Sequence, residues 1–259
     1  MNPGTELLLS EHLRHIKLTT VLKQYPVLAR QARENGWTYE EFLLSLLELE
    51  IQTRADNRLK RRIRDARFPL VKTIESFNYE AAPDLDRRLI RELMDGSYIR
   101  ECRNVIFVGK TGTGKTHLAT ALGLEACRQG IRTRFTTGAG LVNDLIEARG
   151  ERMISRVIQR YSQFGLLILD ELGYVPFSRE GAQLLFQVLA DRYERGSVIV
   201  TTNLGFADWT QLFGDPTLTA ALLDRLTHKA HIIPCNWDSY RLKESLKKKL
   251  PQQTNKEKK

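Results

Sequence analysis

The spacing of apolar residues divides the chain near residue 68, before which it is helical and shows no convincing strand alternation. Gly36 fits a helix stop, and Thr38 opens a Thr-Tyr-Glu-Glu capping box. In that box the Thr38 hydroxyl accepts from the backbone N–H of Glu41, whose carboxylate reaches back. Pro69 ends the next helix, because the residue before a proline avoids helical geometry. We therefore predict a helical domain over 1–68 and a linker over 69–84.

From Val105 onward, short apolar segments alternate with helical ones. The gaps between these segments are long enough for crossover helices, most clearly over 116–128 and 181–195. Short apolar strands separated by helices indicate a parallel sheet covered on both faces. The pattern thus predicts a three-layer α/β domain over 85–250 and a disordered basic tail over 251–259. The five expected strands are 105–108, 132–136, 166–169, 197–201 and 230–233.

Composition narrows the class of protein. Hydrophobic residues make up 42% of the 259 positions, yet no apolar run approaches the roughly 18 residues of a membrane span. The first residues have only a short apolar stretch beside acids, unlike a secretory signal. The cysteines Cys102, Cys127 and Cys235 lie far apart without paired spacing, which is typical of reduced thiols. We expect a cytoplasmic protein that does not associate with membranes.

Positive charge is concentrated in two segments. The formal net charge is +9, and residues 54–72 and 241–259 each carry eight Lys or Arg against two acids. A concentrated basic excess is typical of a surface that binds a polyanion, although a solvated helix face or tail gives the same pattern. We predict DNA contacts from the first segment. A further set of arginines at four-residue spacing, inside the predicted α/β domain, is either a second DNA-binding surface or a solvated helix face. The candidate residues are Arg54, Arg58, Arg61 and Arg62, and in the further set Arg152, Arg156 and Arg160.

An eight-residue segment after the first predicted strand matches the full phosphate-binding loop pattern. Its glycines allow backbone N–H groups to wrap around phosphate oxygens, and the N-terminus of the following helix adds a favourable dipole. Lys115 is expected to bridge the β- and γ-phosphates, and the Thr116 hydroxyl to ligate Mg²⁺. The predicted nucleotide-binding residues are Gly109, Lys110, Thr111, Gly112, Thr113, Gly114, Lys115 and Thr116.

Polar residues at the ends of two later strands complete this site. Asp170 and Glu171 follow four apolar residues, so that Asp170 is expected to hold Mg²⁺ and Glu171 to polarise the attacking water. Asn203 follows the next strand and is expected to orient that water. Adjacent acids favour hydrolysis over simple binding, and the sequence offers no acceptor pocket for a small-molecule kinase. Taken singly, these residues are also compatible with ordinary strand ends.

Two arginines are candidates for stabilising the γ-phosphate. Arg225 precedes the last predicted strand, and Arg241 opens a C-terminal helix. A cation at the γ-phosphate stabilises charge in the transition state, and one supplied by a neighbouring subunit couples hydrolysis to assembly. A surface ion pair is the alternative for either residue alone.

These motifs together resemble the IstB family of transposition helper ATPases, which are close relatives of DnaC helicase loaders and of the DnaA-type initiator clade of AAA+ proteins. The similarity extends over nearly the whole chain. Lys110 departs from the family, whose loops usually have proline there, and its side chain is expected to point away from the nucleotide. The segments that resemble the family are 67–69, 75–79, 114–119, 170–174, 201–209 and 214–226.

The resemblance implies an AAA+ ATPase that binds double-stranded DNA, assembles with ATP into a homo-oligomer and recruits or stimulates a transposase. It implies Walker A roles for Lys115 and Thr116 and Walker B roles for Asp170 and Glu171. It further implies that Asn203 is sensor 1, Arg225 the arginine finger and Arg241 sensor 2. Two alternatives remain at this stage, a replicative helicase loader and a DNA-architectural protein that binds ATP without turnover.

Overall fold

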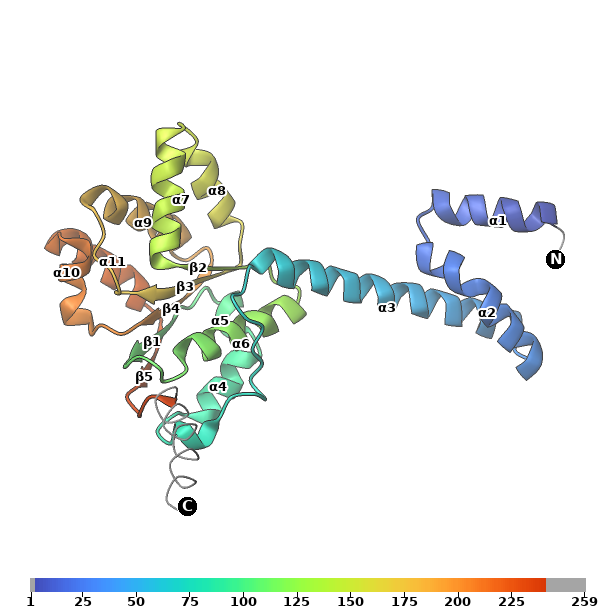
Figure 1. Ribbon diagram of the computed structural model, residues 1–259, viewed down its shortest axis with the longest axis horizontal. Helices are drawn as coiled ribbons and strands as arrows, with labels where there is room; N and C mark the ends of the chain where they lie inside the picture. The colour runs from blue at the N-terminus through green and yellow to red at the C-terminus, as the bar shows by residue number, and fades with distance from the viewer. Residues whose placement is uncertain (1–2, 241–259) are drawn as a thin grey trace, which may run out of the picture. The chain divides into compact units, whose positions relative to one another are not determined.

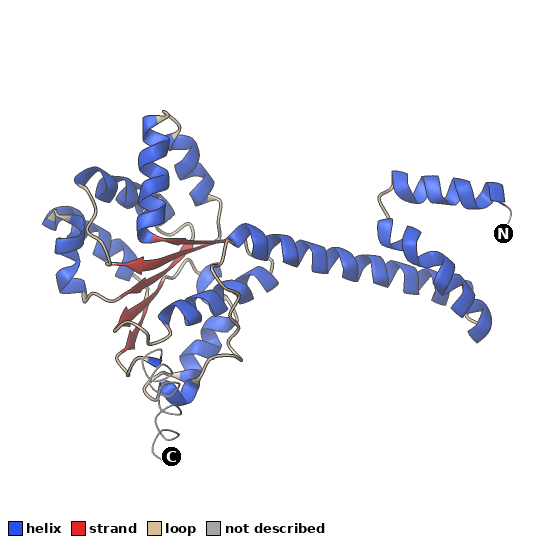
Figure 2. Ribbon diagram, viewed as in Figure 1, coloured by secondary structure: helices blue, strands red, loops and turns tan. Residues whose placement is uncertain are grey.

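The computed structural model describes residues 3–240, and the chain divides into two compact units between Arg61 and Arg62 (Figure 1). The N-terminal unit is helical, as the sequence predicts, and the second unit contains the sheet (Figure 2). Arg241 and the predicted basic tail lie outside the described residues. Among the helices of residues 3–240, none has both the length and the apolar character needed to span a bilayer.

The N-terminal unit contains α1 (Pro3–His15), α2 (Thr19–Asn35) and the first part of α3 (Tyr39–Ala66). Gly36 ends α2 in a left-handed conformation at φ 66°. The predicted capping box is confirmed: the Thr38 N–H donates to Glu41 at 2.8 Å, and the Glu41 N–H donates to the Thr38 hydroxyl at 3.2 Å. The buried core of this unit is small, consisting of Leu13, Val21 and Leu46.

Glu50 of α3 supplies the missing cap of α2. Its carboxylate accepts from the backbone N–H groups of Thr20 at 2.9 Å and Val21 at 3.1 Å, where α2 has no side-chain cap of its own. Burial alone would raise the pKa of Glu50, but hydrogen bonds from Arg54, Val21 and Thr20 lower it overall. The buried carboxylate therefore joins α3 to the start of α2.

The second unit is built on a five-stranded sheet with the order β2-β3-β4-β1-β5, and all pairs are parallel. All five predicted strands are confirmed, most with ends that differ by one or two residues. β3 is the exception, because it runs three residues further than predicted. The strands are β1 (Val105–Gly109), β2 (Thr133–Thr137), β3 (Leu166–Leu172), β4 (Ser197–Thr202) and β5 (His231–Cys235).

Helices cover both faces of this sheet, which confirms the three-layer fold (Figure 2). Alternate strand residues point to opposite faces. Phe107 and Ile168 join the core on one face, while Ile106 and Leu167 join the core on the other. The helices are α4 (Arg87–Met94), α5 (Ser97–Arg100), α6 (Lys115–Arg128), α7 (Gly138–Gly150), α8 (Ile154–Ser162), α9 (Arg179–Arg192), α10 (Trp209–Phe213) and α11 (Pro216–Thr227).

The segment 69–84, for which the sequence predicts a linker, is part of the second unit and packs into its core. Phe77 and Ala82 are buried in its core, and Ile74 packs against the same cluster. Asn78 begins a short 3-10 turn (Tyr79–Ala81) by accepting from two backbone N–H groups. The anchoring residues follow neither helical nor strand spacing, so the pattern alone did not show that the segment is held in place.

Candidate nucleotide-binding site

The phosphate loop connects β1 to α6 at the carboxyl edge of the sheet. Gly112 and Gly114 adopt φ of 83° and 93°, values that other residues rarely take. Gly114 also caps α6, so the helix begins at Lys115 with its N-terminus facing the loop. Unpaired N–H groups at a helix N-terminus bind phosphate oxygens favourably. The loop therefore has the backbone geometry that its sequence predicts.

The segment after β5 forms hydrogen bonds to the backbone of the phosphate loop. The Trp237 indole donates to the Thr113 carbonyl at 2.9 Å, and the Tyr240 N–H donates to the Gly112 carbonyl at 3.0 Å. A Cβ atom at Gly109 would lie 2.1 Å from the Cys235 carbonyl oxygen, so only glycine fits there. Sequence reasoning missed Trp237, because nothing in the sequence pairs residues so far apart.

Lys115 is 9% exposed, and its ammonium group lies against the loop. Its Nζ donates to the carbonyls of Gly109 and Lys110, both at 2.7 Å. The Lys110 carbonyl also accepts from the Thr113 hydroxyl at 2.9 Å, and the Lys110 residue is exposed. The loop contacts Lys110 through its backbone carbonyl and not through its side chain. A residue other than proline is therefore tolerated at position 110.

Thr116 and Asp170 meet between the loop and the acidic strand. The Thr116 hydroxyl lies 2.9 Å and 3.1 Å from the two carboxylate oxygens of Asp170, which is 4% exposed. The Thr201 hydroxyl donates to Asp170 Oδ1 at 2.5 Å. Thr201 was not among the predicted site residues, because its role depends on the pairing of β3 with β4. The structure thus places two hydroxyls on one buried carboxylate.

Glu171 lies in a β-bulge of β3. Leu169 pairs with Val200 and Leu172 pairs with Thr202, so β3 has one extra residue over this interval. Glu171 takes φ 57°, and its N–H donates to the Thr201 hydroxyl at 3.0 Å. Asp170 and Leu172 are buried, whereas Glu171 is exposed. Bulges next to active sites redirect a side chain in this way.

A cavity of about 590 Å³ brings the predicted residues together. Its lining includes Thr116, Asp170, Glu171 and Asn203, together with Phe77 and Ala81 from the segment predicted as a linker. The lining therefore combines oxygen atoms and backbone N–H groups of the loop and strands with apolar side chains. A nucleotide, with phosphates at one end and a planar base at the other, has matching chemistry.

His117 connects this site to the segment before α4. Its Nε2 lies 2.8 Å from the Thr73 carbonyl and 3.2 Å from the Ser76 hydroxyl, and its ring meets Phe77 edge to face. Burial lowers the pKa of His117, an effect partly opposed by its hydrogen bond to Thr73. The sequence placed His117 next to a predicted ligand but gave no sign of its contacts.

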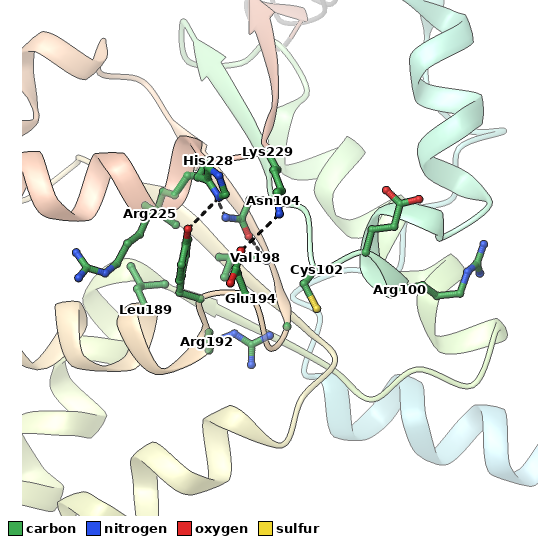
Figure 3. A pocket seen from close by; sticks show the side chains of 14 residues that line it. Arg100, Cys102, Asn104, Leu189, Arg192, Glu194, Val198, Arg225, His228 and Lys229 are labelled. Atoms are coloured by element: carbon green, nitrogen blue, oxygen red, sulfur yellow. Dashed lines mark hydrogen bonds and ion pairs between the residues drawn. The ribbon is translucent and has the colours of Figure 1, made fainter.

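Arg225 does not face this cavity. It lines a second cavity of about 270 Å³ at the amino ends of β1 and β4, where Figure 3 shows its guanidinium group directed away from Asn104 and Lys229. Its Nη1 donates to the Ala221 carbonyl at 2.8 Å, and the group lies 5.1 Å from the ring centre of Phe186. Within one chain, Arg225 and the phosphate loop therefore line different cavities.

Arg192 supports the same end of the sheet. It is 2% exposed and donates to the carbonyls of Tyr161 at 2.7 Å, Phe164 at 2.8 Å and Ser197 at 2.9 Å. Burial lowers the pKa of Arg192 to about 10. These bonds join the start of β4 to the turn before β3. They therefore help to set the register of β3 against β4, on which the β-bulge at Glu171 depends.

The predicted basic residues are in different environments. Arg54 is held within its own unit, since it donates to Glu50 at 2.7 Å and to the Lys17 carbonyl at 2.6 Å. Arg58 and Arg61 are exposed, whereas Arg62 is half-buried.

The stripe of Arg152, Arg156 and Arg160 is not one helical face, because Arg152 lies in the turn before α8 at φ 58°. Its four-residue spacing was counted along a helix that is interrupted there. Arg160 lies 4.0 Å from Asp144 and 5.4 Å from the ring centre of Tyr161. It therefore already forms an ion pair and a cation–π contact within the unit.

The fold and the site together define a P-loop nucleotide-binding protein with the α/β fold of AAA+ proteins. Solved structures with the same fold include DnaA from Aquifex aeolicus, with a TM-score of 0.54 and 20% identity over 70% of this chain and 56% of that one. DnaI has a TM-score of 0.53 and 15% identity over 68% of this chain and 93% of that one. At these identities the likeness concerns the fold alone.

The sequence then specifies the family. Residues 11–248 match the family described as IstB-like ATP binding protein, and the chain belongs to that family. The "Insertion sequence IS21 putative ATP-binding protein" of Pseudomonas aeruginosa is 40% identical over 91% of this chain and 89% of its own length. The corresponding IS5376 protein of Geobacillus stearothermophilus is 37% identical over 90% of this chain and 93% of its own length.

Proposed function

We propose that this protein hydrolyses ATP with Mg²⁺, and that it uses the nucleotide cycle to assemble on double-stranded DNA and to recruit or stimulate a transposase. The observation that supports hydrolysis most directly is the contact between Thr116 and Asp170, with Glu171 beside it. This contact joins the phosphate loop to the acidic strand at the place where a γ-phosphate would lie.

The residues present fit Mg²⁺. The ion prefers oxygen ligands and usually keeps several waters, so that one or two protein groups plus phosphate oxygens suffice to bind it. The Thr116 hydroxyl and the Asp170 carboxylate are such oxygens, already adjacent and mostly buried. When bound, Mg²⁺ neutralises charge that develops on the phosphates.

Each polar group has a distinct task in hydrolysis. Lys115 leaves the loop carbonyls to bind the β- and γ-phosphates, and Glu171 takes the proton of the attacking water. Thr201 bonds both Asp170 and the Glu171 N–H, and so fixes the two acids relative to each other. Asn203, which is exposed at the end of β4, orients the water from the other side.

Arg225 acts in a neighbouring subunit. Because it lies at the amino ends of the strands and the phosphate loop at their carboxyl ends, one copy cannot supply both groups to one ATP. A head-to-tail assembly brings the arginine of one subunit to the phosphates of the next. Arg241 is proposed as the sensor 2 residue on the resemblance alone.

The DNA and transposase roles are supported by family and charge. Relatives across most of the chain are named as proteins of insertion sequences. The exposed residues Arg58 and Arg61, with Lys60 between them, provide cations for DNA phosphates. Arg156 is a further exposed candidate on α8. A transposase is therefore a better-supported partner than a replicative helicase.

Turnover and partner binding test the proposal together. Purified protein should release phosphate from ATP in the presence of Mg²⁺, faster with duplex DNA than without it. Immobilised duplex should then retain the transposase of the same insertion sequence only when this protein and ATP are present. Nucleotide binding with no phosphate release under any condition would show a DNA-architectural protein. Retention of a replicative helicase in place of the transposase would show a helicase loader.

A further inference from the structure

One face of α3 exposes four aliphatic side chains that the N-terminal unit does not cover. Leu43 is 56% exposed, Leu44 56%, Leu47 40% and Ile51 64%. Leu43, Leu47 and Ile51 are four residues apart and Leu44 lies three before Leu47, so all four lie on one side of the helix. The small core of the unit uses a different side of α3, with Leu46 buried against α1 and α2. A contiguous exposed apolar face of this kind marks an interaction surface.

Charges flank these four residues at both ends of the same face. Glu40 lies one turn before Leu43 and Leu44, and Arg54 and Arg58 lie one and two turns after Ile51. Glu40 and Arg58 are exposed and form no ion pair within residues 3–240. Along this face the helix is thus acidic, then apolar, then basic.

Such a face is complementary to itself only when the second helix runs the opposite way. A parallel pair would put Arg54 and Arg58 against the same residues of the other copy, and like charges in contact are unfavourable. An antiparallel pair puts Glu40 against cations at both ends. It is also symmetric about a twofold axis, as most interfaces between identical chains are.

We propose that α3 pairs with α3 of a second copy of this chain, antiparallel and centred on Leu47. In this register Leu43 faces Ile51 of the second copy and Leu47 faces its own equivalent. Glu40 faces Arg54, with Arg58 one turn beyond. Arg54 bonds Glu50 and Lys17 through Nε and Nη2, so its Nη1 is left to donate to the Glu40 carboxylate of the second copy.

The pairing is separate from the nucleotide-driven contact that involves Arg225. Four aliphatic side chains per copy bury less than the roughly 800 Å² per partner of a standard stable interface. The pair therefore forms in a concentration-dependent way and strengthens when ATP and DNA bring subunits together. Because it needs neither ligand, it can be measured without them, and its failure would leave the proposed ATPase function untouched.

Cysteine pairing tests the register. With Cys102 replaced by Ser, Leu47→Cys protein should form a disulfide-linked dimer under mild oxidation without nucleotide. Gln52→Cys is the matched control, since residue 52 is exposed and lies about 140° around the helix from residue 47. A mixture of tagged Leu43→Cys and untagged Ile51→Cys protein should give the mixed dimer in preference to either homodimer. Preferential Leu43→Cys homodimers would overturn the antiparallel arrangement.

Sedimentation of the full chain without ATP or DNA tests the interaction itself. Leu47→Asp should raise the dimer Kd at least about tenfold, since it removes apolar burial and places two like charges together. Glu40→Arg should also weaken the dimer, and adding Arg58→Glu, one turn beyond the facing Arg54, should recover part of it, which a folding defect would not allow. A wild-type protein that stays monomeric at every concentration, or a Leu47→Cys thiol that only the transposase protects from alkylation, would overturn the proposal.

Discussion

The two units of this protein use their apolar residues differently. In the second unit, alternate residues of five parallel strands are buried on both faces, so helices and strands fix one another. Among residues 4–61, whose burial the structure describes, the buried hydrophobics are Leu13, Val21 and Leu46, while several leucines of α3 remain exposed. The difference indicates that the second unit folds around its own large core, whereas the first leaves much of its apolar surface exposed.

The first test asks whether the second unit, although it has its own core, needs a neighbouring copy to complete its nucleotide site. Arg225→Ala should lower turnover by about 10³-fold or more, the usual worth of an arginine finger. Mixing it with Glu171→Gln protein should restore part of the activity, because one mixed interface then has an intact arginine and an intact glutamate. Phosphate release measures both effects, with Arg195→Ala as a surface control. A mixture that co-assembles but stays inactive would place Arg225 outside the catalytic interface.

The second test separates chemistry from binding within the site. Glu171→Gln should reduce turnover by about 10²- to 10⁴-fold while ATP still binds, because glutamine cannot take a proton from water. Lys115→Ala should instead lose ATP affinity, since Lys115 acts on phosphates already present in the ground state. Titration with a fluorescent ATP analogue and single-turnover kinetics distinguish the two. Glu151→Gln, on an exposed turn, should change neither quantity.

The third test compares the two cores by their free energies of unfolding. Ile168→Ala removes a fully buried side chain from the centre of the sheet and should cost about 3–5 kcal/mol. Leu46→Ala should cost about 2 kcal/mol, at the low end of the range, because its small core can collapse around the gap. Hydrogen exchange resolves the units, with β3 reporting on one and α2 on the other. Equal costs would contradict the contrast drawn between the units.

The fourth test concerns the exposed basic residues near the end of α3. Replacing Lys60 and Arg61 by Ala should flatten the dependence of DNA affinity on salt by roughly two units of slope if both contact phosphates. Affinity should fall about equally on unrelated duplexes, since phosphate contacts position without specifying. Arg156→Ala with Arg160→Ala is the parallel variant in the second unit. If only that variant changes the slope, the N-terminal unit binds a protein partner and not DNA.

The sequence predicts much of this arrangement because its strongest signals are local. The five strands and the Thr38–Glu41 capping box each depend on a few consecutive residues, and they are confirmed. The phosphate loop is a local pattern too, and its glycines have the backbone conformations that it predicts. Non-local features were missed. Thr201 contacts Asp170 only because β3 and β4 pair in a particular register, and that register cannot be derived from either strand alone.

Two further misses also have physical reasons. Residues 69–84 lack any periodicity, yet Phe77 and Ala82 anchor them in the core and place them on the cavity wall. The four-residue spacing of Arg152 and Arg156 was counted along a continuous helix, but a left-handed residue interrupts it.

The β-bulge at Glu171 has a consequence for protein engineering. A residue other than glycine in the left-handed region costs about 1–2 kcal/mol, and this protein accepts that cost at its proposed catalytic base. Glycine at position 171 would relieve the strain while removing the carboxylate, so Glu171→Gly should melt at or above the wild-type temperature and be inactive. A search for heat-resistant variants guided by melting temperature alone would therefore favour inactive variants at this position. Each round of such a selection has to include an activity assay.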